Sequence, residues 1–224
     1  MLTLLKRTRN RPLATLLIAL TFTTLLATLA ACATPSTGNN GTPGATTQTG
    51  TRPTTKPRPT ALPQMTMAFC QSILSVDEAN QIMKAPHTAT TIRIDAPTHG
   101  GGSCNYEYAS YKAIVSIVFV SVIPDGTTLD ANAIAAHIQQ GASSVQGATI
   151  TTQPVSGVGD AAVFAAGSAT LTNQPYKFDA LDIAYGRVFF DVNIALLGAD
   201  AASASDSVLL ASFTQIAQLV TSRW

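Results

Sequence analysis

The chain has 224 residues, of which 11% are charged, with 13 Lys and Arg against 12 Asp and Glu. From residue 64 onward six basic residues stand against all 12 acidic ones, a balance of −6, and the basic residues do not cluster. Nucleic acids and anionic lipid surfaces are bound through clustered Lys and Arg. The composition therefore predicts no nucleic-acid partner and no electrostatic contact with a membrane for the C-terminal part.

The N-terminal residues have the three parts of a secretory signal peptide. Four basic residues between positions 6 and 11 precede an apolar run, Leu13 to Leu29, and small residues follow before Cys32. This arrangement is typical of signal peptides. Threonines interrupt the apolar run, which makes it a weak membrane span. We expect residues 1–31 to be removed, leaving a mature chain of 193 residues (224 − 31).

The stretch Leu29-Ala30-Ala31-Cys32 resembles the lipobox of bacterial lipoproteins. This resemblance implies that Cys32 is lipidated and becomes the first residue of the mature chain. It also implies an exported protein that is lipid-anchored at the extracytoplasmic face of the cell membrane.

After Cys32 the chain is rich in Thr, Gly and Pro up to about Gln64 and has no apolar periodicity. Such a segment cannot bury enough surface to offset the entropy lost on ordering. We predict that residues 32–66 are the lipidated cysteine and a disordered tether, and that residues 67–224 form one globular domain.

The domain contains two cysteines, Cys70 and Cys104. In an exported protein two cysteines of one domain are expected to form a disulfide; two buried thiols are the alternative. There is no Cys-x-x-Cys motif, and the three histidines have no metal-ligand spacing. The sequence therefore predicts no redox, metal or cofactor site.

The first half of the domain has signals for helix, strands and helix, in that order. Ser75 and Glu78 have the spacing of a capping box at a helix start. Strands are predicted over residues 88–95, 103–109 and 112–122. The last of these is apolar on both sides, which favours a central strand. Thr128 or Asp130 then caps a helix that ends near Gly141.

The second half has four strand signals and a final helix. Strands are predicted over residues 149–152, 161–166, 176–185 and 187–196, the last two joined at Gly186. Ser205 or Asp206 caps a helix whose apolar positions recur with helical spacing: Leu209, Phe213, Ile216 and Val220. We predict an α+β domain, with a mostly antiparallel sheet of about six or seven strands and three helices packed on it.

Several features together resemble a family of small actinobacterial-type cell-surface lipoproteins that carry a domain of unknown function. They are the lipobox, the tether, Cys70 near a helix start, Cys104 before a Tyr-bearing strand, and the run Val155 to Ala162. The resemblance implies an extracytoplasmic location, one disulfide and an α+β domain, with no established chemistry. Some lipoproteins of similar shape resemble the PsbP-like fold, which implies binding or assembly roles.

Four tyrosines form a candidate ligand groove: Tyr106, Tyr108, Tyr111 and Tyr185. Core packing explains the first two equally well. Asp179, Asp182 and Asp191 form either a carboxylate cluster or solvated charges that pair with Lys177 and Arg187.

The run from Gly157 to Ala162 matches a G-x-G-x-x-A dinucleotide fingerprint, but a strand follows it where a helix is required. A tight turn is therefore the expectation. No nucleophile motif occurs either. We expect a non-catalytic binding module for a small molecule, envelope component or protein. The alternatives are an extracytoplasmic hydrolase and a structural or accessory module that stabilises a partner.

Overall fold

A computed structural model describes residues 57–84, 88–96, 101–107, 113–142 and 147–224. The predicted signal peptide, Cys32 and residues 33–56 of the predicted tether lie outside the described residues. The elements in chain order are α2 (Met67–Ile73), α3 (Val76–Met83), β1 (Thr91–Asp95), β2 (Gly102–Glu107), β3 (Ala113–Val122), α4 (Ala131–Ala142), β4 (Thr149–Val155), β5 (Ala161–Leu171), β6 (Gln174–Tyr185), β7 (Val188–Leu197), α5 (Ala199–Ser203) and α6 (Asp206–Arg223).

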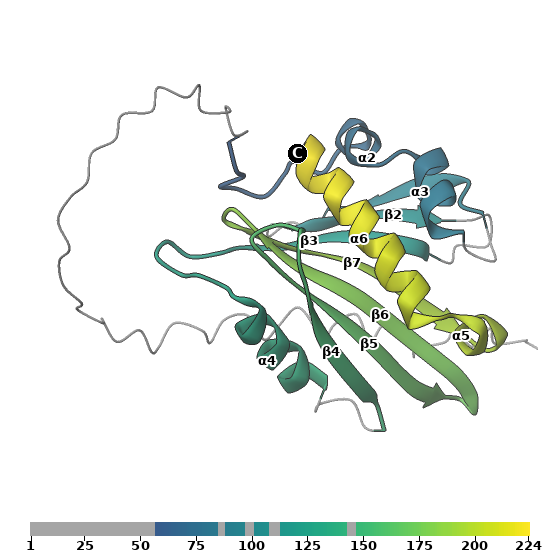
Figure 1. The fold of residues 1–224 in the computed structure, drawn as a ribbon. Coiled ribbons are helices and arrows are strands. Elements are labelled where there is room, and N and C mark those ends of the chain that lie inside the picture. The colour runs from purple at the N-terminus through teal and green to yellow at the C-terminus, as the bar shows by residue number, and fades with distance from the viewer. Residues whose placement is uncertain (1–56, 85–87, 97–100, 108–112, 143–146) are drawn as a thin grey trace, which may run out of the picture. The chain divides into compact units, whose positions relative to one another are not determined.

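The seven strands form one open sheet in the order β1-β2-β3-β7-β6-β5-β4, and every neighbouring pair is antiparallel (Figure 1). The predicted α+β class is confirmed, as is the sequence of three strands, a helix and four strands. β3 lies inside the sheet between β2 and β7, as its two apolar sides predict.

The described part contains five helices rather than the three expected from the sequence. The prediction missed α2 and α5, which have seven and five residues and are too short to show a clear apolar period. Two of the three expected caps are present: Ser75 and Glu78 form a capping box, and Asp130 Oδ1 accepts from the Ala133 amide at 2.8 Å. At α6 Ser205 occupies the N-cap position, as expected, but its side chain makes no capping hydrogen bond. Short helices of this kind depend on such caps and on packing rather than on propensity.

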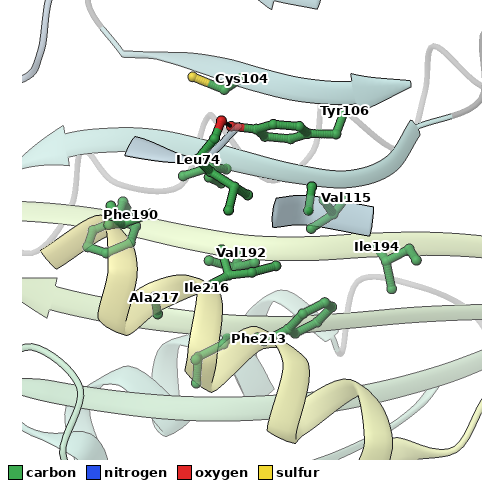
Figure 2. Packing of buried hydrophobic residues seen from close by; sticks show 14 of the residues in the cluster. Leu74, Cys104, Tyr106, Val115, Phe190, Val192, Ile194, Phe213, Ile216 and Ala217 are labelled. Carbon is green, nitrogen blue, oxygen red and sulfur yellow. Dashed lines mark hydrogen bonds between the residues drawn. The ribbon is translucent and has the colours of Figure 1, made fainter. Parts of the chain in front are cut away.

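The main core lies between one face of the sheet and helices α2, α3 and α6 (Figure 1). The four residues predicted to form the apolar face of α6 are all buried: Leu209, Phe213, Ile216 and Val220. Figure 2 shows residues of α6 gathered with the apolar side chains of β7 in this core. Burying one such large side chain stabilises the fold by about 1.5–3 kcal/mol, so α6 is a main source of core stability.

α4 packs against β4 and β5 on the opposite face of the sheet. A smaller apolar cluster lies beneath it: Ile123, Ile134, Ile138, Val163, Ala165, Ala184 and Phe189. None of the described helices is both long and apolar enough to span a bilayer.

Residues 57–66, which the sequence assigned to the tether, belong to the same folded unit as the domain. The Arg187 amide donates to the Pro59 carbonyl at 2.8 Å, and Arg58 forms an ion pair with Asp160. Gly186 has φ +61, and a Cβ there would lie 2.4 Å from Pro59 O, so the segment approaches this turn too closely for a larger residue. The folded unit therefore extends further toward the N-terminus than residue 67.

Candidate functional site

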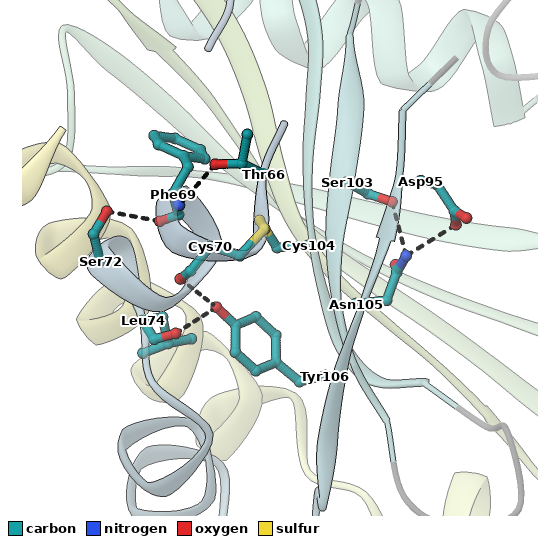
Figure 3. The surroundings of a disulfide bond; sticks show 10 residues. All are labelled: Thr66, Phe69, Cys70, Ser72, Leu74, Asp95, Ser103, Cys104, Asn105 and Tyr106. Carbon is teal, nitrogen blue, oxygen red and sulfur yellow. Dashed lines mark hydrogen bonds between the residues drawn. A yellow bond between two sulfur atoms is a disulfide. The ribbon is translucent and has the colours of Figure 1, made fainter. Parts of the chain in front are cut away.

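Cys70 of α2 and Cys104 of β2 form a disulfide, with Cα atoms 5.7 Å apart (Figure 3). Both residues are completely buried. The predicted pairing is confirmed, and it connects the first helix to the sheet.

Tyr106 lies beside this disulfide and has no exposed surface. Its hydroxyl donates to the Leu74 carbonyl at 2.7 Å and lies 3.3 Å from the Cys70 carbonyl. Burial raises the pKa of Tyr106 well above its usual value. Core packing, the alternative reading of this residue, fits its position, and Tyr106 does not line a surface groove.

Of the other three tyrosines in the set, only Tyr185 belongs to the described residues. Tyr185 is half-buried at the end of β6, with its ring centroid 6.5 Å from that of Trp224. Tyr108 and Tyr111 lie outside the described residues. For those three tyrosines the groove stays a prediction.

The glycine fingerprint is a turn between β4 and β5, as expected. Gly157 and Gly159 have φ +78 and +58, and the Asp160 amide donates to Ala184 O at 2.7 Å. Strand β5 follows directly, so no helix N-terminus is present to face a pyrophosphate.

The three aspartates of the β6–β7 hairpin separate into two groups. Asp182 and Asp191 are directly opposite each other and half-buried. Burial raises the pKa of both; the charge of Asp191 adds to the effect on Asp182, and the pKa of Asp191 rises to about 7 even though Asn193 donates to it. This pair therefore takes up a proton near neutral pH.

Asp179 lies on the other face of the sheet, inside the core, and is not an outer-face charge. It is 1% exposed, and one carboxylate oxygen accepts from the Gly167 amide at 3.2 Å. The second oxygen, Oδ2, has no hydrogen bond and lies 3.3 Å from Lys177 Nζ. Burial raises the pKa of Asp179, and Lys177 offsets only part of this effect.

Lys177 also forms an ion pair with Asp206 in the first turn of α6. Burial by itself would lower the pKa of Lys177, but the hydrogen bond to Asp206 and the charge of Asp179 outweigh it and raise the pKa. The expected pairing of Lys177 with a hairpin aspartate is thus confirmed, whereas Arg187 pairs with Asp125 at 2.8 Å. We call Lys177, Asp179 and Asp206 the ion network.

A cavity of about 260 Å³ borders the ion network. It lies between strands β4 and β5 and the start of α6, with Asp206 in its wall. Its lining combines polar and apolar side chains: Thr151, Thr152, Gln153, Phe164, Ala166, Asp206, Ser207 and Leu210. Ala166 is the register partner of Asp179, so the floor of the cavity adjoins the buried carboxylate.

A second cavity of about 290 Å³ lies between α3 and α6. It is lined by Gln81, Ile82, Lys84, Ser207, Val208, Ala211, Ser212 and Gln215. No ion pair or buried charge adjoins it among the described residues. The first cavity, which combines concavity with a fixed charge network, is therefore the better candidate site.

The sequence did not indicate this cavity, because its walls come from two neighbouring strands and a helix that starts 45 residues after β5 begins (206 − 161). The strand signal for Thr149–Thr152 was correct, but an alternating Thr strand shows nothing about what packs beside it. Among the described residues, no group of three or more His, Cys, Asp or Glu is placed to hold a metal ion.

Comparison of the chain with known proteins gives no match, whether with family models, curated proteins or solved structures. The function must therefore be inferred from the chain itself.

Proposed function

We propose that this chain is a membrane-anchored extracytoplasmic lipoprotein whose domain binds a small molecule and catalyses no reaction. The resemblance of Leu29-Ala30-Ala31-Cys32 to a lipobox supports the anchor and the location. The observation that carries the binding role is the cavity between β4, β5 and α6, with the ion network beside it.

The cavity has the general features of a ligand site. Phe164 and Leu210 give it apolar walls, and Thr151, Gln153 and Ser207 provide groups that donate and accept hydrogen bonds. Its hydroxyl groups have no His in the lining to activate them. This composition favours binding over nucleophilic catalysis.

The anchor is tested by changing Cys32 to Ala. We expect the variant to lose incorporation of labelled fatty acid and to leave the membrane fraction. Ala33→Ser, a small change at the next position, is the matched control and should stay at the membrane. An unlabelled wild-type protein, or a Cys32→Ala variant that remains membrane-bound, would show the anchor proposal to be wrong.

The binding role is tested by saturation-transfer NMR of the purified protein mixed with small molecules extracted from its own membranes, a method that detects weakly bound ligands. We expect a small molecule to bind the wild-type protein and to be excluded by Thr151→Trp, because Thr151 is exposed at the cavity wall and an indole there fills the space. Thr149→Trp on the same strand, outside the lining, is the control. Identical ligand binding by both variants would contradict a binding site in this cavity.

A further inference from the structure

We propose that the ligand of this cavity is a neutral sugar ring. This inference rests on the proposed binding function and names the ligand class for the same site. It is argued from charge, hydrogen-bonding groups, apolar surface and size.

The charges around the cavity disfavour an ionic ligand. Asp206 is the only ionisable residue in the lining, and it already pairs with Lys177. Lys177 is shared with buried Asp179, so the ion network has a net charge of −1. An anion would be repelled by the uncompensated charge, and a cation would compete with Lys177 for Asp206. A neutral ligand is not repelled by this charge and does not compete with Lys177 for Asp206.

The polar groups of the lining suit a ligand with several hydroxyls. Thr151 and Ser207 provide side-chain hydroxyls, and Gln153 provides an amide with both donors and an acceptor. Asp206 adds carboxylate oxygens that accept only. Because a sugar hydroxyl both donates and accepts, one ring can satisfy this mixed set, whereas a ligand with acceptors alone cannot.

The start of α6 brings the first amides of the helix to the same wall. The first amides of an α-helix have no partner within the helix, and Ser205 makes no side-chain hydrogen bond to cap them. Its Oγ lies 2.9 Å from Ser207 Oγ, so the two hydroxyls adjoin each other at this end of the cavity. Neutral hydroxyl oxygens of a ligand can accept from these donors.

Apolar surface and size limit the ligand to about one ring. Half-buried Leu210, with the largely buried Phe164 and Ala166 beside it, gives the cavity an apolar side for the C–H face of a sugar. The volume of about 260 Å³ lies just below the range of about 300–1,000 Å³ for drug-sized ligands. A single sugar residue, free or at the end of a glycan, fits this space better than an oligosaccharide lying fully inside it.

The ion network holds one wall of the cavity in position before any ligand binds. Asp179 is fixed by the Gly167 amide and by Lys177, and Lys177 in turn holds Asp206. Preorganised groups lose less entropy on binding. Asp206 is therefore ready to accept from a ligand hydroxyl.

The experiment titrates the isotopically labelled domain, residues 56–224, with glucose, galactose, mannose, N-acetylglucosamine and arabinose, and follows amide shifts by NMR. This segment is one compact unit. We expect at least one sugar to bind with a dissociation constant on the order of 1 mM, because so small a ligand gains limited free energy. The shifts should centre on β4, β5 and the first turn of α6.

Matched variants and a charged analogue test the site and the ligand class. Thr151→Trp should weaken binding at least about tenfold, and Thr149→Trp should leave it unchanged. The uronic acid of the sugar that binds should bind at least about tenfold more weakly, because its carboxylate faces Asp206. Ser207→Trp, which fills the cavity from the helix side, provides the same test if Thr151→Trp does not fold.

The inference is overturned if no sugar binds, if Thr151→Trp and Ser207→Trp leave sugar binding intact, or if the uronic acid binds as tightly as the neutral sugar. A non-sugar molecule that binds the wild-type protein and is excluded by Thr151→Trp would also overturn it, while leaving the proposed binding function in place. If every molecule that binds the wild-type protein binds Thr151→Trp equally well, the proposed function itself is contradicted.

Discussion

Glu78 connects the start of α3 to the last turn of α6. Its carboxylate accepts from the Ser75 amide at 2.9 Å, and Arg223 donates to it at 2.6 and 2.9 Å. The hydrogen bond from Arg223 is the largest of the effects that lower the pKa of Glu78 to about 2. Since the folded pKa lies below the usual 4.5, this carboxylate stabilises the fold above about pH 4.5, and the effect is lost as the pH falls toward 2.

We predict that Glu78→Gln lowers the free energy of unfolding by about 1 kcal/mol at pH 7, a value reduced for the partly exposed setting of the pair. Gln preserves the capping-box geometry, so the loss reports the charge. The difference from wild type should vanish near pH 2. Urea unfolding at several pH values measures it, with exposed Asp77→Asn on the same helix as the control. An equal loss at pH 7 and pH 2 would contradict the ion-pair explanation.

The pair Asp182–Asp191 affects the pH dependence of stability in the opposite direction from Glu78, because the pKa values of this pair are raised. The pKa of Asp191 is raised from 3.8 to about 7, so the folded state binds a proton that the unfolded state has released. Stability is therefore highest below about pH 4 and falls as the pH rises to about 7.

We predict that Asp191→Asn removes the part of this pH dependence that Asp191 contributes, while burial still raises the pKa of Asp182. The variant should be more stable than wild type above pH 7 by about 2 kcal/mol, below the limit of about 4 kcal/mol that the full shift of Asp191 implies. Thermal unfolding between pH 4 and 8 measures it. Asp125→Asn, at a carboxylate paired on the surface with Arg187, is the control. A variant whose stability falls with pH as steeply as that of wild type would contradict the prediction.

At the scale of the element, α2 depends on the hydroxyl of Tyr106. This seven-residue helix is too short to be stable alone. Thr66 Oγ1 accepts from the Phe69 amide at its start, and the Tyr106 hydroxyl donates to Leu74 O just past its end. Both ends are thus satisfied by side chains, one of them from β2.

Tyr106→Phe should lower the free energy of unfolding by about 1–2 kcal/mol, because the ring still fills the core but the buried Leu74 carbonyl loses its donor. Amide hydrogen exchange should show faster opening in α2 than in α6. Tyr185→Phe, at a half-buried position, is the control. If exchange in α2 is as slow as in wild type, the hydroxyl does not hold this helix.

The sequence predicted the elements with strong local signals. The alternation of Val188, Phe190 and Val192 identified β7 and its buried face, and the spacing from Leu209 to Val220 identified α6. α2 had no such signal, since its stability comes from Tyr106 and from the disulfide, both contributed by a strand that follows later in the chain. Tertiary contacts, rather than local propensity, determine whether a helix of this length forms.

At the scale of the whole molecule, the parts that sequence alone could not place are those made by distant segments. The cavity needs β4, β5 and α6 together, and the packing of Pro59 against the β6–β7 turn needs a segment that looks like tether by composition. Asp179 illustrates the same limit. The alternation of side chains along β6 does not show which face of the sheet is buried. The position of α6 shows that Asp179 lies on the buried face.

The disulfide is the longest-range covalent constraint on the fold and the one that the sequence did predict. Cys70 and Cys104 are separated by 34 positions and join α2 to β2. On the chain-entropy model, closing a loop of this size destabilises the unfolded state by about 4 kcal/mol. Both sulfurs are buried in the main core, so the bridge also contributes packing.

We predict that the Cys70→Ala, Cys104→Ala double variant loses about 2–4 kcal/mol of unfolding free energy in urea. Since the constraint acts mainly on the unfolded chain, wild-type protein reduced and unfolded in denaturant should refold with a similar deficit. The reduced wild-type protein controls for the lost sulfur packing, because it keeps both side chains. If the reduced protein is as stable as the oxidised one, the bridge adds nothing to this fold, and α2 is held by Tyr106 and its packing against α6 alone.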